Sequence, residues 1–312
     1  MMEVIAEYGS ENLAKVYVAK MRNNQQYLIE FVESIQPPIP RNNKWVLIVS
    51  TLFGCPVGCK MCDAGVSPYM GPLTAEEIVE EIDYMVQQRF KDNHIPIPKF
   101  KIQFARMGDP ALNKHIIDVL KRLPSIYDAP GLLPSISTIA PSSATNFLEQ
   151  IIDIKNNYYS QGMFQFQFSI HTTDKDKRKY LIPISTLSFS DMASFGKNYF
   201  QQGDKKITLN FALCKGYSVD TSVIRTYFDP DLFIIKLTPI NPTKNAKKYG
   251  LQSQIDPNDP DSANTIVDSF KQQGYDVILS IGEVEENNIG SNCGMFISEY
   301  TENRIQNRVY AH

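Results

Sequence analysis

Hydrophobic positions follow two patterns that alternate along most of this chain. Short apolar runs, typical of buried strands, occupy residues 45–52, 100–107, 134–139, 164–171, 207–213 and 233–239. Between them lie stretches in which apolar residues recur with helical spacing. Strands joined by helical crossovers lie parallel, with right-handed connections. The pattern therefore predicts the α/β class, as a parallel sheet curled into a partial (β/α)6 barrel with its functional groups at the carboxyl ends of the strands.

The helix expected after the first strand illustrates the second pattern. Thr74-Ala-Glu-Glu77 has the form of a capping box, and Ile78, Ile82 and Met85 follow at helical spacing. A last helix is expected to stop at Gly274, which suits a C-cap, and residues 275–280 add a final strand.

Residues 1–42 precede this pattern and are expected to form an N-terminal extension. Residues 16–20 and 27–32 alternate like strands around a polar turn, which predicts a β-hairpin. The proline-rich stretch 36–43 disfavours both a helix and a central strand, so it is the expected linker. The main domain is then expected to span residues 43–312, including a C-terminal tail.

The composition is that of a globular protein, with 43% hydrophobic and 21% charged residues. No apolar run is long enough to span a bilayer, and the N-terminus lacks the basic flank and apolar core of a signal peptide. Three of the five cysteines share one short motif, so we expect a reducing cytoplasm and not a disulfide scaffold. The net charge of −3 gives no general attraction to phosphates, so we expect no DNA or membrane partner. It also weakens the case for RNA without removing it.

Cys55, Cys59 and Cys62 stand at CxxxCxxC spacing on the loop after the first strand. Three such thiolates can each hold one iron of a [4Fe–4S] cluster, and the fourth iron then has no cysteine from this motif. In radical S-adenosylmethionine (SAM) enzymes, the amino and carboxylate groups of SAM bind that iron. The alternative is three buried core cysteines, which this spacing in a strand–loop–helix context disfavours.

Several motifs between residues 15 and 300 resemble those of radical SAM methylases of the RlmN/Cfr type, which methylate an adenosine of ribosomal RNA. The cysteine loop and the helix start at 73–78 resemble the family's cluster loop and first helix. The other matching segments are RMGDPALN at 106–113, SISTIAP at 135–141, SIH at 169–171, PINP at 239–242 and NCG at 292–294. The resemblance implies a radical SAM barrel with a [4Fe–4S] cluster and SAM as cofactors.

The resemblance also implies SAM-binding roles for small and polar residues at the strand ends. The carbonyl of Gly108 and the carboxylate of Asp109, at the family's glutamate position, would accept hydrogen bonds from the SAM ammonium. Groups for the carboxylate and ribose of SAM would come from Ser135 or Ser137, Ser169, His171 and Asn241. Taken alone, Asp109 also suits a turn after a strand, and a lone histidine can equally be a satisfied residue at a strand end.

Cys293 matches the family's methyl-carrying cysteine. There the thiol takes a methyl group from one SAM, and the radical from a second SAM activates that methyl for attack on an sp2 ring carbon. A thiolate is a strong nucleophile towards a sulfonium methyl. The alternative is an ordinary free cysteine in a polar C-terminal loop.

Three departures from the family concern the substrate. The family's second catalytic cysteine is replaced by Ile48, and Cys214 is a possible substitute, although it is more typical of a buried small residue. An Arg-Gly before the tail is replaced by acidic residues at 283–286. The RNA-binding accessory domain has no counterpart except the hairpin, where Glu30 takes the place of a proposed proton acceptor. We expect Glu30 to be a solvated strand charge.

These observations leave three hypotheses open. The first is a radical SAM methyltransferase that uses Cys293 to methylate an sp2 carbon of a small molecule, a peptide or, as in the family, an RNA adenosine. The second is direct hydrogen abstraction from a substrate without methyl transfer. The third is a passive cluster protein, which the SAM motifs disfavour. The expected partner is an electron donor such as flavodoxin or ferredoxin, and the basic stretch 244–248 is the best candidate for an RNA contact.

Overall fold

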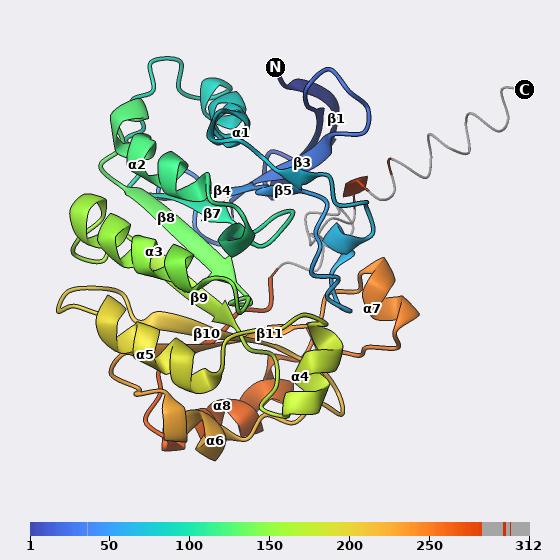
Figure 1. The fold of residues 1–312 in the computed structure, drawn as a ribbon, viewed down its shortest axis with the longest axis vertical. Coiled ribbons are helices and arrows are strands. Elements are labelled where there is room, and N and C mark those ends of the chain that lie inside the picture. The colour runs from blue at the N-terminus through green and yellow to red at the C-terminus, as the bar shows by residue number, and fades with distance from the viewer. Residues whose placement is uncertain (36, 283–295, 298–299, 301–312) are drawn as a thin grey trace, which may run out of the picture.

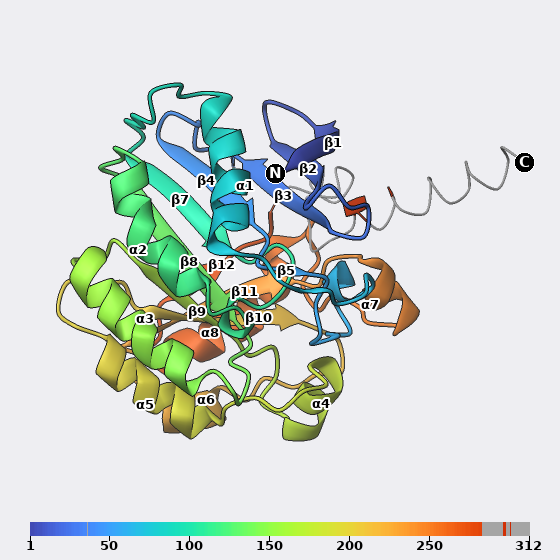
Figure 2. The same ribbon diagram turned by 45° about the horizontal axis from the view of Figure 1, so that its top comes forward.

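The computed structural model describes residues 1–35, 37–282, 296–297 and 300. Within these residues, ten strands form one sheet in the spatial order β1-β2-β3-β4-β7-β8-β9-β10-β11-β12. Figure 1 shows this sheet with helices along one side, and Figure 2 shows how it curves. The partial (β/α) barrel expected from the alternating pattern is therefore confirmed.

The barrel part of the sheet is a run of parallel strands, each hydrogen-bonded to the next. Its strands are β4 (Lys44–Val49), β7 (Lys99–Phe104), β8 (Leu132–Thr138), β9 (Gln165–Ser169), β10 (Ile207–Leu213), β11 (Phe233–Pro239) and β12 (Val277–Leu279). The helices are α1 (Ala75–Gln87), α2 (Ile116–Ile126), α3 (Thr145–Tyr158), α4 (Lys175–Leu181), α5 (Phe189–Tyr199), α6 (Thr221–Tyr227), α7 (Lys244–Lys248) and α8 (Asn264–Gln272). A separate two-stranded sheet joins β5 (Leu52–Phe53) to β6 (Gly71–Pro72).

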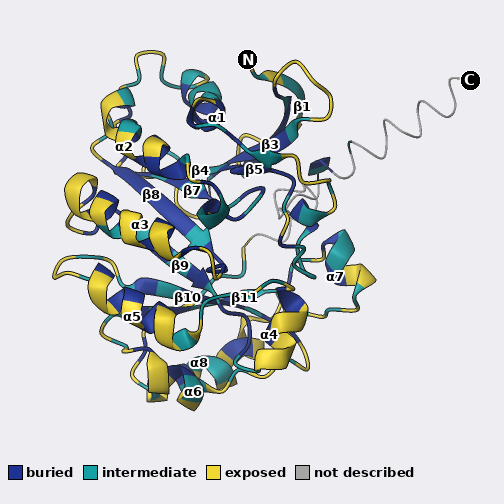
Figure 3. Ribbon diagram, viewed as in Figure 1, coloured by how far each residue is buried: buried dark blue, intermediate teal, exposed yellow. Residues whose placement is uncertain are grey.

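Side chains alternate between the two faces of each strand. Outward residues such as Trp45, Phe100 and Leu237 belong to the main core, under the helices. Figure 3 shows this division, with buried strands and helices that expose their outer faces. Inward residues such as Gln103 and Lys236 line a cavity inside the curve of the sheet. Helices thus cover the outer, apolar face of the parallel strands, and the inner face lines the cavity with both polar and apolar residues.

The N-terminal strands continue the same sheet. β1 (Glu3–Gly9), β2 (Ala14–Lys20) and β3 (Leu28–Ser34) form an antiparallel meander, and β3 pairs antiparallel with β4. The expected hairpin is confirmed as β2 and β3, whereas β1 was not predicted. Because β3 occupies the edge of β4, it protects the backbone groups of that strand from unwanted pairing.

Glu33 of β3 fixes this extension to the barrel. Its carboxylate is almost fully buried and accepts hydrogen bonds from the indole Nε1 of Trp45 at 2.9 Å and from Nη2 of Arg89 at 3.0 Å. The Nε atom of Arg41 lies 3.1 Å from the same carboxylate. Two guanidinium groups therefore compensate one buried negative charge.

Besides β1, the main differences between the predicted and the observed elements are two. The expected strand at 45–52 ends at Val49, because Thr51 and Leu52 donate their backbone N–H groups to the carbonyl of Met107 and leave the ladder. Helices α4 to α7 were not assigned from the sequence.

Among the described residues, no helix is both long and apolar enough to cross a lipid bilayer.

Candidate active site

A cavity of about 400 Å³ opens at the carboxyl ends of the parallel strands. All three motif cysteines line it, together with residues from β7 to β11 and from the loops that follow them. A volume of this size lies within the range of small-molecule sites. The sequence-based expectation that polar residues at strand ends meet at one place is therefore met by most of them.

The cysteine loop begins at a glycine that no other residue can replace without strain. Gly54 has φ +68°, and a Cβ atom there would lie 2.4 Å from the carbonyl oxygen of Pro68. Gly58, also at φ +68°, lies between the first two cysteines. These turns leave Cys55, Cys59 and Cys62 half-buried, with their side chains at the cavity.

Helix α7 holds this loop from the other side. The buried carboxylate of Asp63 accepts hydrogen bonds from the backbone N–H groups of Lys244 at 2.9 Å and Asn245 at 2.8 Å. The side chain of Asn245 donates to the carbonyl of Cys62 at 2.8 Å. The hydroxyl of Thr243 donates to the carbonyl of Met61 at 3.0 Å. The position of the third cysteine is therefore set by residues far away in the sequence.

The three thiols fit an iron–sulfur cluster better than a single metal ion. Among the described residues, no group of three or more His, Cys, Asp or Glu side chains is arranged to hold one ion. In a [4Fe–4S] cluster each thiolate binds a different iron, so the sulfur atoms need not converge on one point. The Sγ atom of Cys62 also accepts a hydrogen bond from the backbone N–H of Ala64 at 3.4 Å, a contact that favours thiolate character.

Gly108 and Asp109 follow β7 and line the cavity. Gly108 has φ +89°, and a Cβ atom there would meet the side chain of Leu52 at 2.4 Å. Asp109 is buried, and its carboxylate accepts from Thr138 Oγ1 at 2.7 Å and from the backbone N–H groups of Ala111 and Ile139. Burial raises the pKa of Asp109 to about 6. Asp109 thus joins the ends of β7 and β8, and the carbonyl of Gly108 lies beside it at the cavity.

The two serine alternatives on β8 differ in position. Ser137 lines the cavity and accepts a hydrogen bond from Gln167 at 3.3 Å. Ser135 is buried and is not among the residues that line the cavity. Ser169 and Asn241 also line it.

His171 is neutral and oriented. Its Nδ1 atom accepts the backbone N–H of Ala212 at 3.1 Å, so the ring proton sits on Nε2. Burial, and secondarily the charge of Arg178, lowers the pKa of His171 to about 3. The residue lines the cavity, so it offers a neutral imidazole at the end of β9.

Arg178 of α4 was not predicted from the sequence. It is buried and donates to the carbonyls of Ser169 at 3.2 Å and Ile170 at 3.3 Å, and to the hydroxyl of Thr186. Burial lowers its pKa to about 10, and its charge interacts favourably with the Cys59 thiolate. This guanidinium ties the end of β9 to α4 beside the cysteine loop.

Glu30 corrects one expectation. It is fully buried and not a solvated charge, because it pairs with Arg106 at the end of β7 and accepts the backbone N–H of Ile297 at 2.7 Å. Arg106 and Ile48 both line the cavity. Ile48, which the resemblance aligns with the family's second cysteine, therefore faces the site with an apolar side chain.

The two remaining cysteines have different outcomes. Cys214 is buried against Ile240 and Ala246 and does not line the cavity, as expected for a small hydrophobic residue. Cys293, the candidate methyl carrier, lies outside the described residues.

Four polar side chains within the barrel were not predicted from the sequence. Gln103, Gln167, Asn210 and Lys236 project inward from β7, β9, β10 and β11 and line the cavity. Each stands at an alternate position of a strand that the pattern already assigned to a parallel sheet. Since such strands are usually apolar on both faces, a polar residue at an inward position was the available signal.

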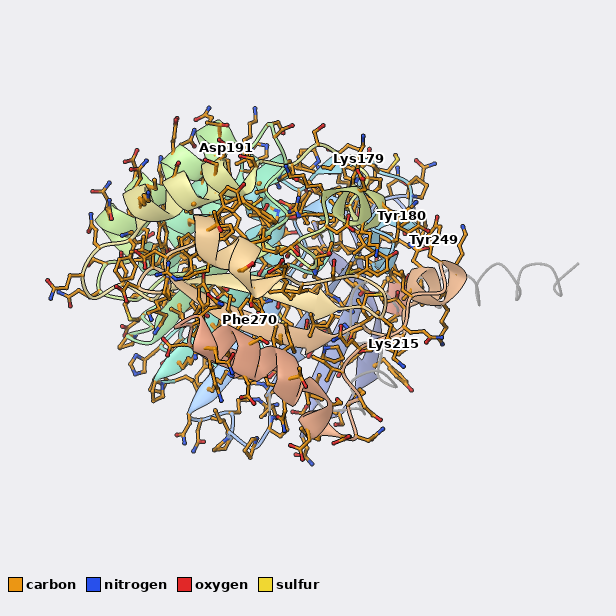
Figure 4. All side chains as sticks on the ribbon, turned by 90° about the horizontal axis from the view of Figure 1, so that it is seen from below. Lys179, Tyr180, Asp191, Lys215, Tyr249 and Phe270 are labelled. Atoms are coloured by element: carbon orange, nitrogen blue, oxygen red, sulfur yellow. The ribbon has the colours of Figure 1, made fainter. Side chains whose placement is uncertain are left out.

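A basic and aromatic rim adjoins the cysteine loop. Lys60 lies over the ring of Tyr249 at 4.4 Å, Lys248 lies over the same ring at 5.5 Å, and Lys177 lies over Tyr217 at 5.8 Å. We call these residues, with Lys179, Tyr180 and Lys215, the rim. Figure 4 shows Lys179, Tyr180, Tyr249 and Lys215 at one side of the molecule, away from Asp191.

Several curated proteins that are similar in sequence to this chain are named as RNA methyltransferases of the RlmN type. A dual-specificity RNA methyltransferase RlmN from Helicobacter hepaticus is 27% identical over 186 residues, which are 58% of this chain and 47% of that protein. Proteins named as probable RlmN methyltransferases are 27% identical in Chlorobium phaeobacteroides and 26% identical in Endomicrobium trichonymphae. The chain spans 48% and 70% of their respective lengths. No protein-family model matches the chain.

A solved structure agrees over nearly the whole chain. A radical SAM methyltransferase from Sphaerobacter thermophilus superposes with a TM-score of 0.71 and 17% identity, covering 94% of this chain and 80% of that one. The resemblance inferred from the motifs and the expected type of barrel are thus confirmed. The expected enzyme class, with a [4Fe–4S] cluster and SAM as cofactors, agrees with these relatives.

Proposed function

We propose that the protein is a radical SAM methyltransferase. The observation that carries this proposal is the meeting of three half-buried cysteines on one glycine-shaped loop with small and polar residues from the ends of the parallel strands, all around one cavity. Bound to Cys55, Cys59 and Cys62, the cluster would supply the electron that cleaves SAM to a 5′-deoxyadenosyl radical.

The chain's own residues would bind and orient SAM. The carbonyl of Gly108 would accept from the SAM ammonium, while Asp109 keeps that carbonyl in place through its bonds to the end of β8. His171 would donate from Nε2, and Ser137, Ser169 and Asn241 would supply further polar groups. Ser137 rather than Ser135 is the proposed contact from β8, because Ser135 does not line the cavity.

We further propose Cys293 as the methyl carrier to an sp2 carbon. Its thiolate would attack the methyl of a SAM sulfonium, forming a carbon–sulfur bond and releasing S-adenosylhomocysteine. The match of Asn292-Cys-Gly294 to the RlmN tail supports this role. Because Ile48 replaces the second cysteine at the cavity, resolution of any covalent adduct would need another group.

Release of 5′-deoxyadenosine tests the first part of the proposal. Anaerobically reconstituted protein, reduced with dithionite in the presence of SAM, should release 5′-deoxyadenosine. Cys59→Ala should abolish release, while the matched control Cys214→Ala, at a buried cysteine outside the cavity, should leave it intact. No release by the wild-type protein would point to the passive cluster protein.

Mass spectrometry tests the methyl carrier. After growth with ample SAM, the peptide that contains Cys293 should be heavier by one methyl group in place of a hydrogen. An unmodified thiol, together with normal 5′-deoxyadenosine release, would instead favour direct hydrogen abstraction from the substrate.

RNA is the second candidate acceptor, and the rim supports it. Its lysines and tyrosines are the residue types that bind phosphates and stack on bases, and the relatives named RlmN are RNA methyltransferases. RNA binding should weaken steeply as salt rises. It should also weaken in Lys248→Ala, whereas the control Lys121→Ala, at an exposed lysine of α2, should bind like the wild type.

A further inference from the structure

Four lysines face the interior of the barrel. Lys44 and Lys99 are direct partners across β4 and β7, Lys101 lies further along β7, and Lys236 lies on β11. Their inward direction follows from alternation, because Trp45, Phe100, Ile102, Ile235 and Leu237 beside them belong to the outer core. All four side chains are half-buried.

These lysines act on one another electrostatically. Burial lowers the pKa of Lys101 well below its ordinary value, and Lys236, Lys99 and Lys44 lower it further. Burial and the charge of Lys44 also lower the pKa of Lys236. Residues on β7 and β11 can influence each other in this way only because the curved sheet brings their inner faces together.

No compensating negative charge accompanies them in the described part of the chain. Their ammonium groups have no hydrogen-bond or ion-pair partner among the described residues, and the inward positions of the parallel strands there carry no Asp or Glu. The carboxylate of Asp109, which lines the cavity, is already engaged, since it accepts three hydrogen bonds, and Glu30 outside the cavity lining pairs with Arg106. Clustered cations without anions destabilise a folded chain, so a bound anion would relieve this repulsion.

A second polar group in the same region has an unused bonding site. Asn210 is 9% exposed, lines the cavity and pairs in register with Lys236. Its side-chain oxygen has no hydrogen-bond partner among the described residues, and as an acceptor it calls for a hydrogen-bond donor on a ligand rather than for the anion itself. Buried polar atoms of this kind are rare unless a ligand or water satisfies them.

We propose that Lys236, supported by Lys101, forms a binding site for the phosphate or carboxylate group of a small acceptor molecule, and that the oxygen of Asn210 accepts from a donor group of the same molecule. Lys236 lines the cavity and stands three residues before the end of β11, which is about 10 Å below the strand ends. An acceptor could therefore place its reactive carbon near the cysteine loop and its anionic end at Lys236. The assignment to the acceptor rests on the proposed function, whereas anion binding itself does not.

Inorganic phosphate is a suitable probe of this site. Isothermal titration calorimetry on the full-length reconstituted protein, at constant ionic strength, should show saturable phosphate binding by the wild type. Lys236→Met should bind phosphate at least about tenfold more weakly, because a hydrogen bond to a charged group is lost. Lys236→Arg should retain most of the binding, and the control Lys121→Met should match the wild type. Acetate in a parallel titration distinguishes a carboxylate site from a phosphate site.

Thermal unfolding provides a second measurement. Without phosphate, Lys236→Met should melt at the same temperature as the wild type or higher, because repulsion is removed. Phosphate should raise the melting temperature of the wild type more than that of Lys236→Met. The proposal is overturned if phosphate raises the melting temperature of all variants equally. It is also overturned if only Lys248→Met loses the phosphate-dependent rise, because phosphate would then bind at the rim.

The acidic residues at 283, 285 and 286 are an alternative source of carboxylate. If the triple glutamine variant of Glu283, Glu285 and Glu286 binds phosphate while the wild type does not, the lysines pair with the chain's own carboxylates and the proposal is wrong. Neither measurement requires turnover. Failure here with normal 5′-deoxyadenosine release would therefore leave the proposed function standing.

Discussion

His171 combines a left-handed backbone conformation with a neutral imidazole. Its φ is +68°, a conformation that asparagine tolerates better than most residues. Asparagine can also place an oxygen near the position of Nδ1, which accepts the N–H of Ala212. The residue therefore offers a conservative variant, His171→Asn, beside the truncation His171→Ala.

Truncation of His171 should cost more stability than its replacement by asparagine. His171→Ala leaves the buried N–H of Ala212 without an acceptor, so we expect a loss of about 2 kcal/mol. His171→Asn should lose less than half of that amount. Urea unfolding measures both, and equal losses would contradict the role of the Nδ1 bond.

The stability of the wild type should depend on pH through this residue. Its pKa falls from 6.5 to about 3 on folding, so the unfolded chain binds a proton that the folded chain does not. Stability from this group is therefore present above pH 6.5 and is lost as the pH falls towards 3. The free energy of unfolding should therefore fall less between about pH 7 and about pH 5 for His171→Asn than for the wild type. If the free energy of unfolding fell by the same amount in both proteins, His171 would not be buried in the neutral form.

Gly108 is required both for its backbone conformation and for space. Gly108→Ala should destabilise the protein by about 2 kcal/mol, because φ is +89° and the new Cβ would overlap Leu52. In a double-mutant cycle, Leu52→Ala should recover part of the steric loss, because it removes Cγ and Cδ1, but the Cβ of residue 52 still lies 2.5 Å from the new Cβ and the conformational loss remains. Strict additivity of the two changes would contradict the overlap.

The sequence predicted these site residues only where a motif contained them. Gly108, Asp109 and His171 stand in recognisable motifs, and each lies at the cavity. Arg178 and Glu30 could not be placed, because their roles depend on partners in other elements. From the sequence alone, a charged residue in an amphipathic segment is assigned to the solvent-exposed face, because the elements that bury it are not known.

At the scale of elements, the cysteine loop depends on helix α7. Asp63→Ala removes the acceptor for two backbone N–H groups at the start of α7, so we expect a loss of about 2 kcal/mol and a lower iron content after reconstitution. Asp63→Asn keeps one acceptor oxygen, so its stability and iron content should lie between those of the wild type and of Asp63→Ala. Iron and sulfide assays with thermal unfolding measure both effects. Normal iron content in Asp63→Ala would show that the clamp does not position the cysteines.

Element prediction succeeded where local pattern and tertiary burial agreed. Strands β10 and β11 lie where the apolar runs predicted them, and α1 starts with the predicted capping box at Thr74. The short helices α4 and α7 were missed because they are polar and fixed by caps at Asp174 and Thr243 rather than by an apolar stripe. β1 was missed because much of it is exposed.

At the scale of the whole molecule, the N-terminal strands and the barrel form one sheet. Glu33→Ala should destabilise the protein by about 3 kcal/mol, because Arg41 and Arg89 would lose their buried counter-charge. The midpoint of thermal unfolding should fall by about 6 °C in a single transition. The control Glu3→Ala removes a largely exposed partner of Lys20 and should cost less than about 1 kcal/mol. Two separate transitions would contradict the continuity of the sheet.

The interior lysines show why the barrel's contents could not be predicted. Lys99 and Lys101 alternate with Phe100 and Ile102, which is also the pattern of a strand with one solvated face. Only closure of the sheet converts that face into an interior. The charge of a cavity is therefore a property of the assembled barrel and not of any one strand.

The clamp between the cysteine loop and α7 has a consequence for maturation in the cell. Asp63 and the backbone of Lys244 are separated by 181 residues of chain. When the cysteines leave the ribosome, the helix that fixes their loop has not yet been synthesised. If the three cysteines hold a cluster, the loop that holds it can take its final position only after α7 has been made, so we expect stable loading to follow the synthesis of residues 244–245.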